Sequence, residues 1–145
     1  MGKPGTSERP TLTSDAGFLL ARAGGKAIRS LNRALEPYRL RSRHYTVLMA
    51  VSERGGLSQR ELGELLGIDP SAVVALIDDL SAAGFVRRDP HPEDRRTRLV
   101  MLTDAGRDAF TQATELAARM EDDLLAPLTP EERGTLVDLL RRITR

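Results

Sequence analysis

The sequence of 145 residues contains no cysteine and no tryptophan, and aromatic residues make up only 3% of it. Without cysteine, disulfides, thiolate zinc sites and cysteine nucleophiles are excluded together. A core with so few aromatic side chains has to be built from Leu, Val, Ile and Ala. This composition favours closely packed helices over a sandwich or a barrel.

Long apolar runs are also missing. No stretch approaches the ~20 apolar residues that are needed to span a bilayer. The N-terminal stretch MGKPGTSERPTLTSD lacks the apolar core of a signal peptide. We therefore expect a cytoplasmic protein without a membrane partner.

Charge is balanced over the whole chain but unevenly distributed along it. The net charge is +1, yet residues 1–60 hold 11 Lys/Arg against 4 Asp/Glu, while residues 61–102 and 103–145 are both net acidic. Basic residues at 22, 26, 29 and 33 recur at helical spacing and form a stripe, which is either a solvated face, a phosphate contact or a partner-binding face.

Apolar periodicity and capping residues predict a mainly α-helical chain. Residues 1–13 lack this periodicity and are expected to form a disordered tail. A first helix is predicted from a cap at Thr13 or Ser14 to about Glu36. Further helices are predicted at about residues 43–53, 58–66, 69–83, 103–126 and 129–143.

The third and fourth predicted helices are arranged as a helix-turn-helix. Ser58 and Glu61 have the spacing of a capping box, and Gly67 stands where a left-handed residue ends the helix. Asp69 and Pro70 begin the next helix after only a few residues, as this motif requires.

Two β-type runs follow this helix pair, at Phe85–Arg88 and Arg98–Leu102. Pro90 and Pro92 cannot donate hydrogen bonds to a strand ladder, so we expect both in the hairpin tip. The predicted fold is therefore mainly α with a small β-hairpin wing, a winged helix-turn-helix with dimerisation helices at both ends. The dimerisation region comprises residues 14–36 and 103–145, and the winged helix comprises residues 37–102.

In a winged helix, the second helix of the pair lies in the major groove of DNA and the hairpin reaches the minor groove or the backbone. With the apolar stripe of this helix inward, no outward side chain makes a bidentate contact to guanine, so shape readout should outweigh direct readout. The candidate DNA-binding residues are Ser58, Gln59, Arg60, Pro70, Ser71, Val74, Ala75, Asp78, Arg87, Arg88, Arg95, Arg96 and Arg98.

The wing holds most of the positive charge in this region. Arg95 at the tip is predicted to enter the minor groove, where narrow A·T tracts concentrate negative potential. The alternative is a solvated hairpin whose arginines form salt bridges with its own acidic residues.

This part of the chain resembles the MarR family of bacterial transcriptional regulators. The residues that resemble the family are Leu57-Ser58-Gln59, Leu62, Leu65-Leu66, Ser71 to Leu80, Gly84 to Arg88, Asp94-Arg95-Arg96, Leu102-Thr103 and Gly106. The resemblance implies that Asp94 and Arg96 brace the wing and that Arg95 reaches DNA. Many relatives have a polar and then a basic residue where this chain has Val74-Ala75, so base-specific readout by this helix is reduced.

The resemblance also implies a symmetric dimer in which the first helix and the last two helices interlock. The residues themselves also favour a dimer, because the terminal helices have little to pack on within one chain. A two-fold dimer places its recognition helices about one DNA turn, ~34 Å, apart, so the operator should be an inverted repeat.

The family often binds small aromatic or phenolic anions beside the winged helix, which shifts DNA affinity. The candidate ligand-binding residues are Tyr38, Arg41, Arg43, His44 and Tyr45. An imidazole near guanidinium groups can hold a carboxylate or phenolate. The alternative for His44 is an ordinary helix residue that bonds to backbone or water.

An enzyme would need a catalytic constellation, and the sequence contains none. His44 and His91 are far apart, no serine lies in a nucleophile elbow, and no Gly loop is suited to phosphate. Two histidines without cysteine argue against a metal site, and no cofactor is expected. The remaining alternative is a constitutive or architectural DNA-binding or protein-binding winged helix, without inverted-repeat preference or ligand response.

Overall fold

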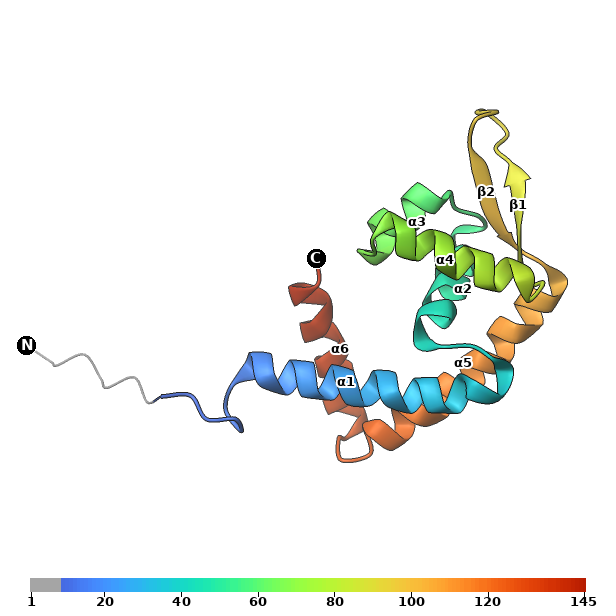
Figure 1. Cartoon of the computed structure of the whole chain (residues 1–145). Helices are drawn as coiled ribbons and strands as arrows, with labels where there is room; N and C mark the ends of the chain where they lie inside the picture. Colours follow the sequence, from blue (N-terminus) through green and yellow to red (C-terminus); the bar gives the residue numbers. More distant parts are fainter. Residues whose placement is uncertain (1–8) are drawn as a thin grey trace, which may run out of the picture.

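The computed structural model describes residues 9–145 and is mainly helical, with one antiparallel β-hairpin (Figure 1). This confirms the predicted fold class. The elements are α1 (Ala16–Leu35), the 3₁₀ helix η1 (Glu36–Tyr38), α2 (Ser42–Arg54), α3 (Gln59–Leu66), α4 (Pro70–Ala82), β1 (Val86–Pro90), β2 (Arg98–Leu102), α5 (Asp104–Leu124) and α6 (Pro130–Ile143).

The elements separate into two parts. Figure 1 shows α1 crossing α5 in one part, and α3 and α4 lying side by side in the other, with the hairpin projecting beyond them. α2 lies between the two parts and packs against α1, α4, α5 and β2. Among residues 9–145, no helix is long and apolar enough to cross a membrane.

The start of α1 differs from the prediction. Asp15 is the N-cap, and its carboxylate accepts a hydrogen bond of 2.7 Å from the Phe18 amide, so the expected cap at Thr13 or Ser14 is wrong. Ser14 instead closes a turn, because its hydroxyl accepts from the Thr11 amide at 2.9 Å. Of the tail predicted over residues 1–13, residues 1–8 lie outside the described part of the chain.

The caps of the helix-turn-helix are confirmed. The Ser58 hydroxyl accepts from the Glu61 amide at 3.2 Å, and the Glu61 carboxylate accepts from the Ser58 amide at 2.8 Å. Hydrogen bonds to the Glu61 carboxylate, first from the Ser58 amide and then from the Ser58 hydroxyl, hold the pKa of Glu61 below its ordinary value. Gly67 adopts a φ of 61°, the left-handed geometry that ends α3, and Asp69 caps α4.

The predicted inward stripe of α4 is confirmed, since its four members are buried: Val73, Leu76, Ile77 and Leu80. On α3, Leu62 is buried, whereas Leu65 is 47% exposed. α3 has only eight residues and presents a narrow strip to the core. Leu66 continues this strip from Leu62, whereas Leu65 lies beside it.

The predicted hairpin is present, but its first strand begins one residue later than predicted, at Val86, and extends to Pro90. β1 pairs with β2 from Val86 opposite Leu102 to Pro90 opposite Arg98, so the expectation that Pro90 lies in the tip is wrong. The His91 amide donates to the Thr97 carbonyl at 3.1 Å. Bonded pairs alternate along an antiparallel ladder, so Pro90 occupies a position where no amide is needed.

The terminal helices leave apolar surface open. Leu20 and Ile28 on α1 are 45% and 53% exposed, although Leu35 at the end of the same helix is fully buried. On α6, Leu139 and Ile143 are 49% and 64% exposed. Among the described elements, none packs extensively on α6.

Candidate DNA interface and ligand cavity

The outward face of α4 is formed by the predicted residues. Ser71, Val74, Ala75 and Asp78 are all exposed. The amide and the hydroxyl of Ser71 both donate hydrogen bonds to the Asp69 carboxylate. These bonds lower the pKa of Asp69, and the bond from the hydroxyl has the larger effect. The N-terminal turn of α4 is therefore already occupied by its own capping carboxylate.

A cleft of about 600 Å³ lies between α3 and α4. It brings together four predicted DNA-binding residues, Gln59, Arg60, Pro70 and Val74. Arg60 forms an exposed ion pair of 3.0 Å with Glu64 on the next turn of α3. Such a pair contributes little stability and leaves the guanidinium accessible.

Three of the predicted DNA-binding residues contact one another. The Arg88 guanidinium donates from Nη2 to Asp78 Oδ1 at 2.7 Å and from Nε to Gln59 Oε1 at 3.1 Å. One side chain of β1 therefore joins the recognition helix α4 to the start of α3. Sequence reasoning placed these residues on one surface but did not identify their mutual contacts.

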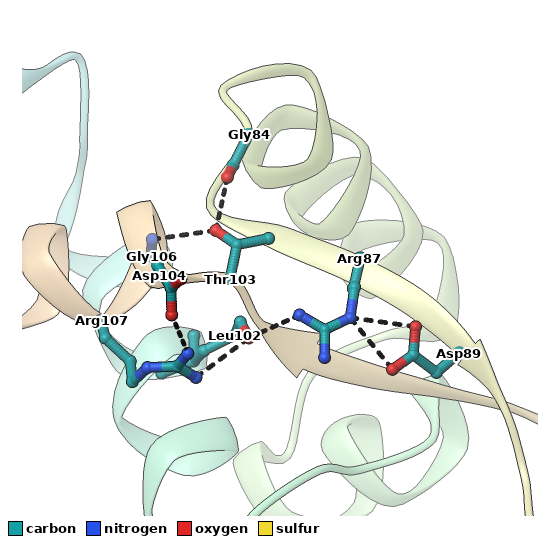
Figure 2. Close-up of polar contacts among 8 residues, drawn as sticks. All are labelled: Gly84, Arg87, Asp89, Leu102, Thr103, Asp104, Gly106 and Arg107. Carbon is teal, nitrogen blue, oxygen red and sulfur yellow. Dashed lines mark hydrogen bonds and ion pairs between the residues drawn. The ribbon is translucent and has the colours of Figure 1, made fainter.

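Arg87 is held at the base of the wing (Figure 2). Its Nε donates to both carboxylate oxygens of Asp89, at 3.1 and 3.0 Å, and its Nη1 donates to the Leu102 carbonyl at 3.2 Å. This guanidinium is committed to the hairpin and to the start of α5, although sequence reasoning grouped it with the DNA contacts.

Figure 2 also shows how the hairpin joins α5. The Thr103 hydroxyl donates to the Gly84 carbonyl at 2.6 Å and accepts from the Gly106 amide at 3.0 Å. The Arg107 guanidinium pairs with Asp104 and donates to the same Leu102 carbonyl at 3.3 Å. Thr103 and Gly106 belong to the Leu-Thr-x-x-Gly signal in the sequence, whereas Arg107 was missed.

The wing tip is braced differently from what the resemblance implied. Asp94 Oδ1 accepts from the backbone amide of Arg96 at 3.0 Å, and Asp94 Oδ2 accepts from the Thr97 hydroxyl at 2.9 Å. The Arg96 guanidinium therefore does not brace Asp94, and Thr97, which sequence reasoning missed, supplies the second donor. These two hydrogen bonds hold the pKa of Asp94 below its ordinary value, and the bond from the Arg96 amide has the larger effect.

Three arginines remain at the outer part of the wing. Arg95, Arg96 and Arg98 are exposed, and none of them forms an ion pair within residues 9–145. The alternative of a hairpin closed by its own salt bridges therefore fits only Arg87, which pairs with Asp89. Arg88 pairs with Asp78 of α4, outside the hairpin, and the outer arginines form no such pair among residues 9–145.

A separate cavity of about 320 Å³ lies where α1, α2 and α4 meet, and it contains three of the predicted ligand-binding residues. His44 is only 8% exposed. Its Nδ1 accepts from the Arg41 amide at 3.0 Å, and its Nε2 lies 3.0 Å from Asp79 Oδ2. The lining residues are Ile28, Asn32, Arg41, Ser42, Arg43, His44, Leu76 and Asp79.

The two tyrosines predicted for the ligand site lie elsewhere. Tyr45 is buried and stacks on Phe110, with ring centroids 5.9 Å apart, so it belongs to the core. Tyr38 is 44% exposed on η1 and does not line the cavity. Within residues 9–145, no group of three or more His, Asp and Glu is placed to hold a metal ion.

Two short helices joined by a tight turn, followed by a hairpin with outward arginines, define a winged helix-turn-helix, a class of DNA-binding protein. Residues 40–97 match the family model described as the MarR family. The chain belongs to the MarR family. It is therefore a DNA-binding transcriptional regulator, and it is not an enzyme.

Three similar proteins illustrate this relationship. A putative transcriptional regulatory protein for the hcr operon of Thauera aromatica is 30% identical over 99% of this chain and 90% of its own. A cysteine-to-serine variant of MarR from Escherichia coli, solved with operator DNA, is 30% identical over 89% of this chain and 93% of its own, with a TM-score of 0.80. CouR from Rhodococcus jostii RHA1, solved with p-coumaroyl-CoA, is 32% identical over 93% and 95%, with a TM-score of 0.84.

Proposed function

We propose that this protein is a homodimeric repressor that binds an inverted-repeat operator and is released by a small aromatic or anionic ligand. The main support for the DNA-binding part of this proposal is a set of exposed arginines on the outer wing that form no ion pair among the described residues, namely Arg95, Arg96 and Arg98. Their charge offsets the acidic balance of the surrounding segment at the place where a duplex would lie.

The apolar surface of the terminal helices supports dimerisation. Leu20 and Ile28 on α1 and Leu139 and Ile143 on α6 are all substantially exposed in the single chain. A second copy would cover these side chains through a two-fold interface. The same symmetry would place two copies of α4 about one DNA turn, ~34 Å, apart, which matches an inverted repeat.

The cavity between α1, α2 and α4 supports the ligand response. Two of its lining residues, Leu76 and Asp79, belong to the recognition helix itself. The Arg41 and Arg43 guanidinium groups would bind a carboxylate or phenolate, and Leu76 and Ile28 would contact an aromatic ring. A ligand in this cavity would act directly on the position of α4. Binding of p-coumaroyl-CoA by CouR favours an aromatic acid or its thioester.

DNA binding is tested with a duplex that the wild-type protein selects from random DNA. Fluorescence anisotropy should give a lower dissociation constant for this duplex than for a scrambled one, with affinity falling steeply as salt rises. The selected sequence should contain an inverted repeat. Equal affinity for both duplexes would favour the alternative of a constitutive or architectural DNA-binding protein.

The ligand response is tested separately, with a thermal-shift screen of hydroxylated benzoic and cinnamic acids. Compounds that raise the melting temperature should also release the selected duplex. Arg43→Ala should remove both effects, whereas Tyr38→Ala, on η1 outside the cavity, should retain them. A hit that is insensitive to Arg43→Ala places the ligand elsewhere.

A further inference from the structure

We propose that Asp78 is a positioning residue for DNA recognition: it acts through Arg88 to fix the wing against the recognition helix, and it does not itself contact bases. This inference rests on the proposed DNA-facing role of α4 and the wing. The structural evidence for it is a pair of hydrogen bonds that the Arg88 guanidinium donates, to Asp78 at 2.7 Å and to Gln59 at 3.1 Å.

The three side chains come from three different elements. Arg88 lies on β1 opposite Val100, Asp78 lies on the third turn of α4, and Gln59 is the first residue of α3. A planar guanidinium has donors that point in fixed directions, so two acceptors in different directions determine its orientation. The orientation of Arg88 in turn relates the hairpin to both helices.

The charge of Asp78 makes this arrangement informative. Its side chain is 62% exposed, on the face of α4 that is predicted to approach the duplex. A carboxylate near phosphates repels DNA of any sequence, so electrostatics alone disfavours an acid at this position. An exposed ion pair also contributes little to folding. Holding Arg88 in place gives this carboxylate a role that neither overall charge nor stability supplies.

The two explanations predict opposite changes in affinity for the selected duplex when Asp78 is removed. If Asp78 only repels DNA, its removal strengthens binding to every duplex. If it positions Arg88, its removal weakens binding to the selected duplex, which needs the wing and α4 in register, while scrambled DNA still gains from the lost repulsion.

Glu93 provides a matched control. It is an exposed acid in the wing loop, and its side chain makes no hydrogen bond or ion pair with a described residue. Glu93→Ala should strengthen binding to both duplexes by the same factor, about two- to fivefold, because only repulsion is removed. The specificity ratio, which is the dissociation constant for scrambled DNA divided by that for the selected duplex, should therefore be unchanged.

The experiment measures both dissociation constants for the full-length variants. Asp78→Ala should strengthen binding to scrambled DNA as Glu93→Ala does, but weaken binding to the selected duplex about tenfold, an effect comparable with one mismatched base pair. Asp78→Asn keeps an acceptor for Arg88 without the charge, so it should retain most of the wild-type ratio. A merely structural role predicts no such rescue and no change in the ratio.

A double-mutant cycle tests the route through Arg88. Once Arg88→Ala has removed the guanidinium, adding Asp78→Ala should leave the ratio unchanged. The inference is overturned if Asp78→Ala raises affinity for both duplexes equally, or lowers the ratio by the same factor with and without Arg88. A wild-type ratio of one would overturn the proposed function as well, whereas a high wild-type ratio that Asp78→Ala leaves intact overturns this inference alone.

Discussion

The arginines of the wing differ in whether their side chains are bound by acidic residues. Arg87 and Arg88 at the base bind acidic side chains, and Arg87 also donates to the Leu102 carbonyl. Arg95 at the tip is exposed and has no ion-pair partner among the described residues. Its side chain therefore keeps the freedom to enter a narrow groove, where the negative potential is strongest.

Substituting Arg95 should weaken DNA binding through charge. Arg95→Ala is expected to weaken binding to A·T-rich duplexes by about tenfold and to reduce the slope of log affinity against log salt by about one. Arg142→Ala removes the same charge from an exposed position in the last turn of α6, outside the winged helix, and should change neither quantity. A salt titration of Arg95→Ala that matches the wild type would remove Arg95 from the interface.

Asp94 gives the wing tip a dependence on pH. The Arg96 amide and the Thr97 hydroxyl lower its pKa in the folded protein. Its contribution to loop stability is therefore present above the ordinary aspartate pKa and is lost as the pH falls through the lowered value. The Arg96 amide should shift in NMR spectra with a midpoint below the ordinary aspartate value. The Asp94→Asn variant should show no such titration, and a wild-type midpoint at or above the ordinary value contradicts the assignment.

Helices and turns followed from local chemistry, and the contacts between them did not. The Ser58–Glu61 capping box and the left-handed Gly67 depend on residues close in sequence, so periodicity and capping rules located them. The bond between His44 and Asp79 joins residues 35 positions apart, and no local pattern indicates it. For the same reason, the bond between Asp78 and Arg88 was not predicted, although both residues were expected on the DNA-facing surface.

The connection between the hairpin and α5 depends on a close backbone approach. A Cβ atom at Gly106 would lie 1.9 Å from the Phe85 carbonyl oxygen, far inside van der Waals contact. The sequence marked Gly106 only as part of a motif, and the packing supplies the reason for it. α5 can begin directly against the hairpin because this residue has no side chain.

Gly106→Ala should therefore destabilise the protein by about 3 kcal/mol or more, since backbone has to move to admit the methyl group. Chemical denaturation followed by circular dichroism measures this loss. Gly134→Ala is the matched control, because a Cβ there meets nothing within 4 Å. In α6 this change should be neutral or slightly stabilising, by up to about 1 kcal/mol. Equal effects of the two substitutions would refute the close-approach argument.

The recognition helix is held from two sides in the folded chain. Asp78 faces Arg88 of the wing, and the adjacent Asp79 faces His44 of α2 at the cavity that we propose for a ligand. Because an amide donates to His44 Nδ1, the ring hydrogen is on Nε2 and is donated to Asp79. A ligand that displaced Asp79 would thus act on the same turn of α4 that fixes the wing. This adjacency provides a short physical route between the cavity and the DNA-facing surface.

The proposed dimer should depend on the apolar face of α6. Leu139→Asp combined with Ile143→Asp places two charges where the partner would pack, so sedimentation should show a monomer. Binding to the selected duplex should fall by at least about a hundredfold, because two linked half-site contacts become one. Leu65→Asp is the control, since Leu65 is similarly exposed but lies on α3, outside the terminal helices. It should remain dimeric, and an unchanged molecular mass for the α6 variant would show that the subunits meet through another surface.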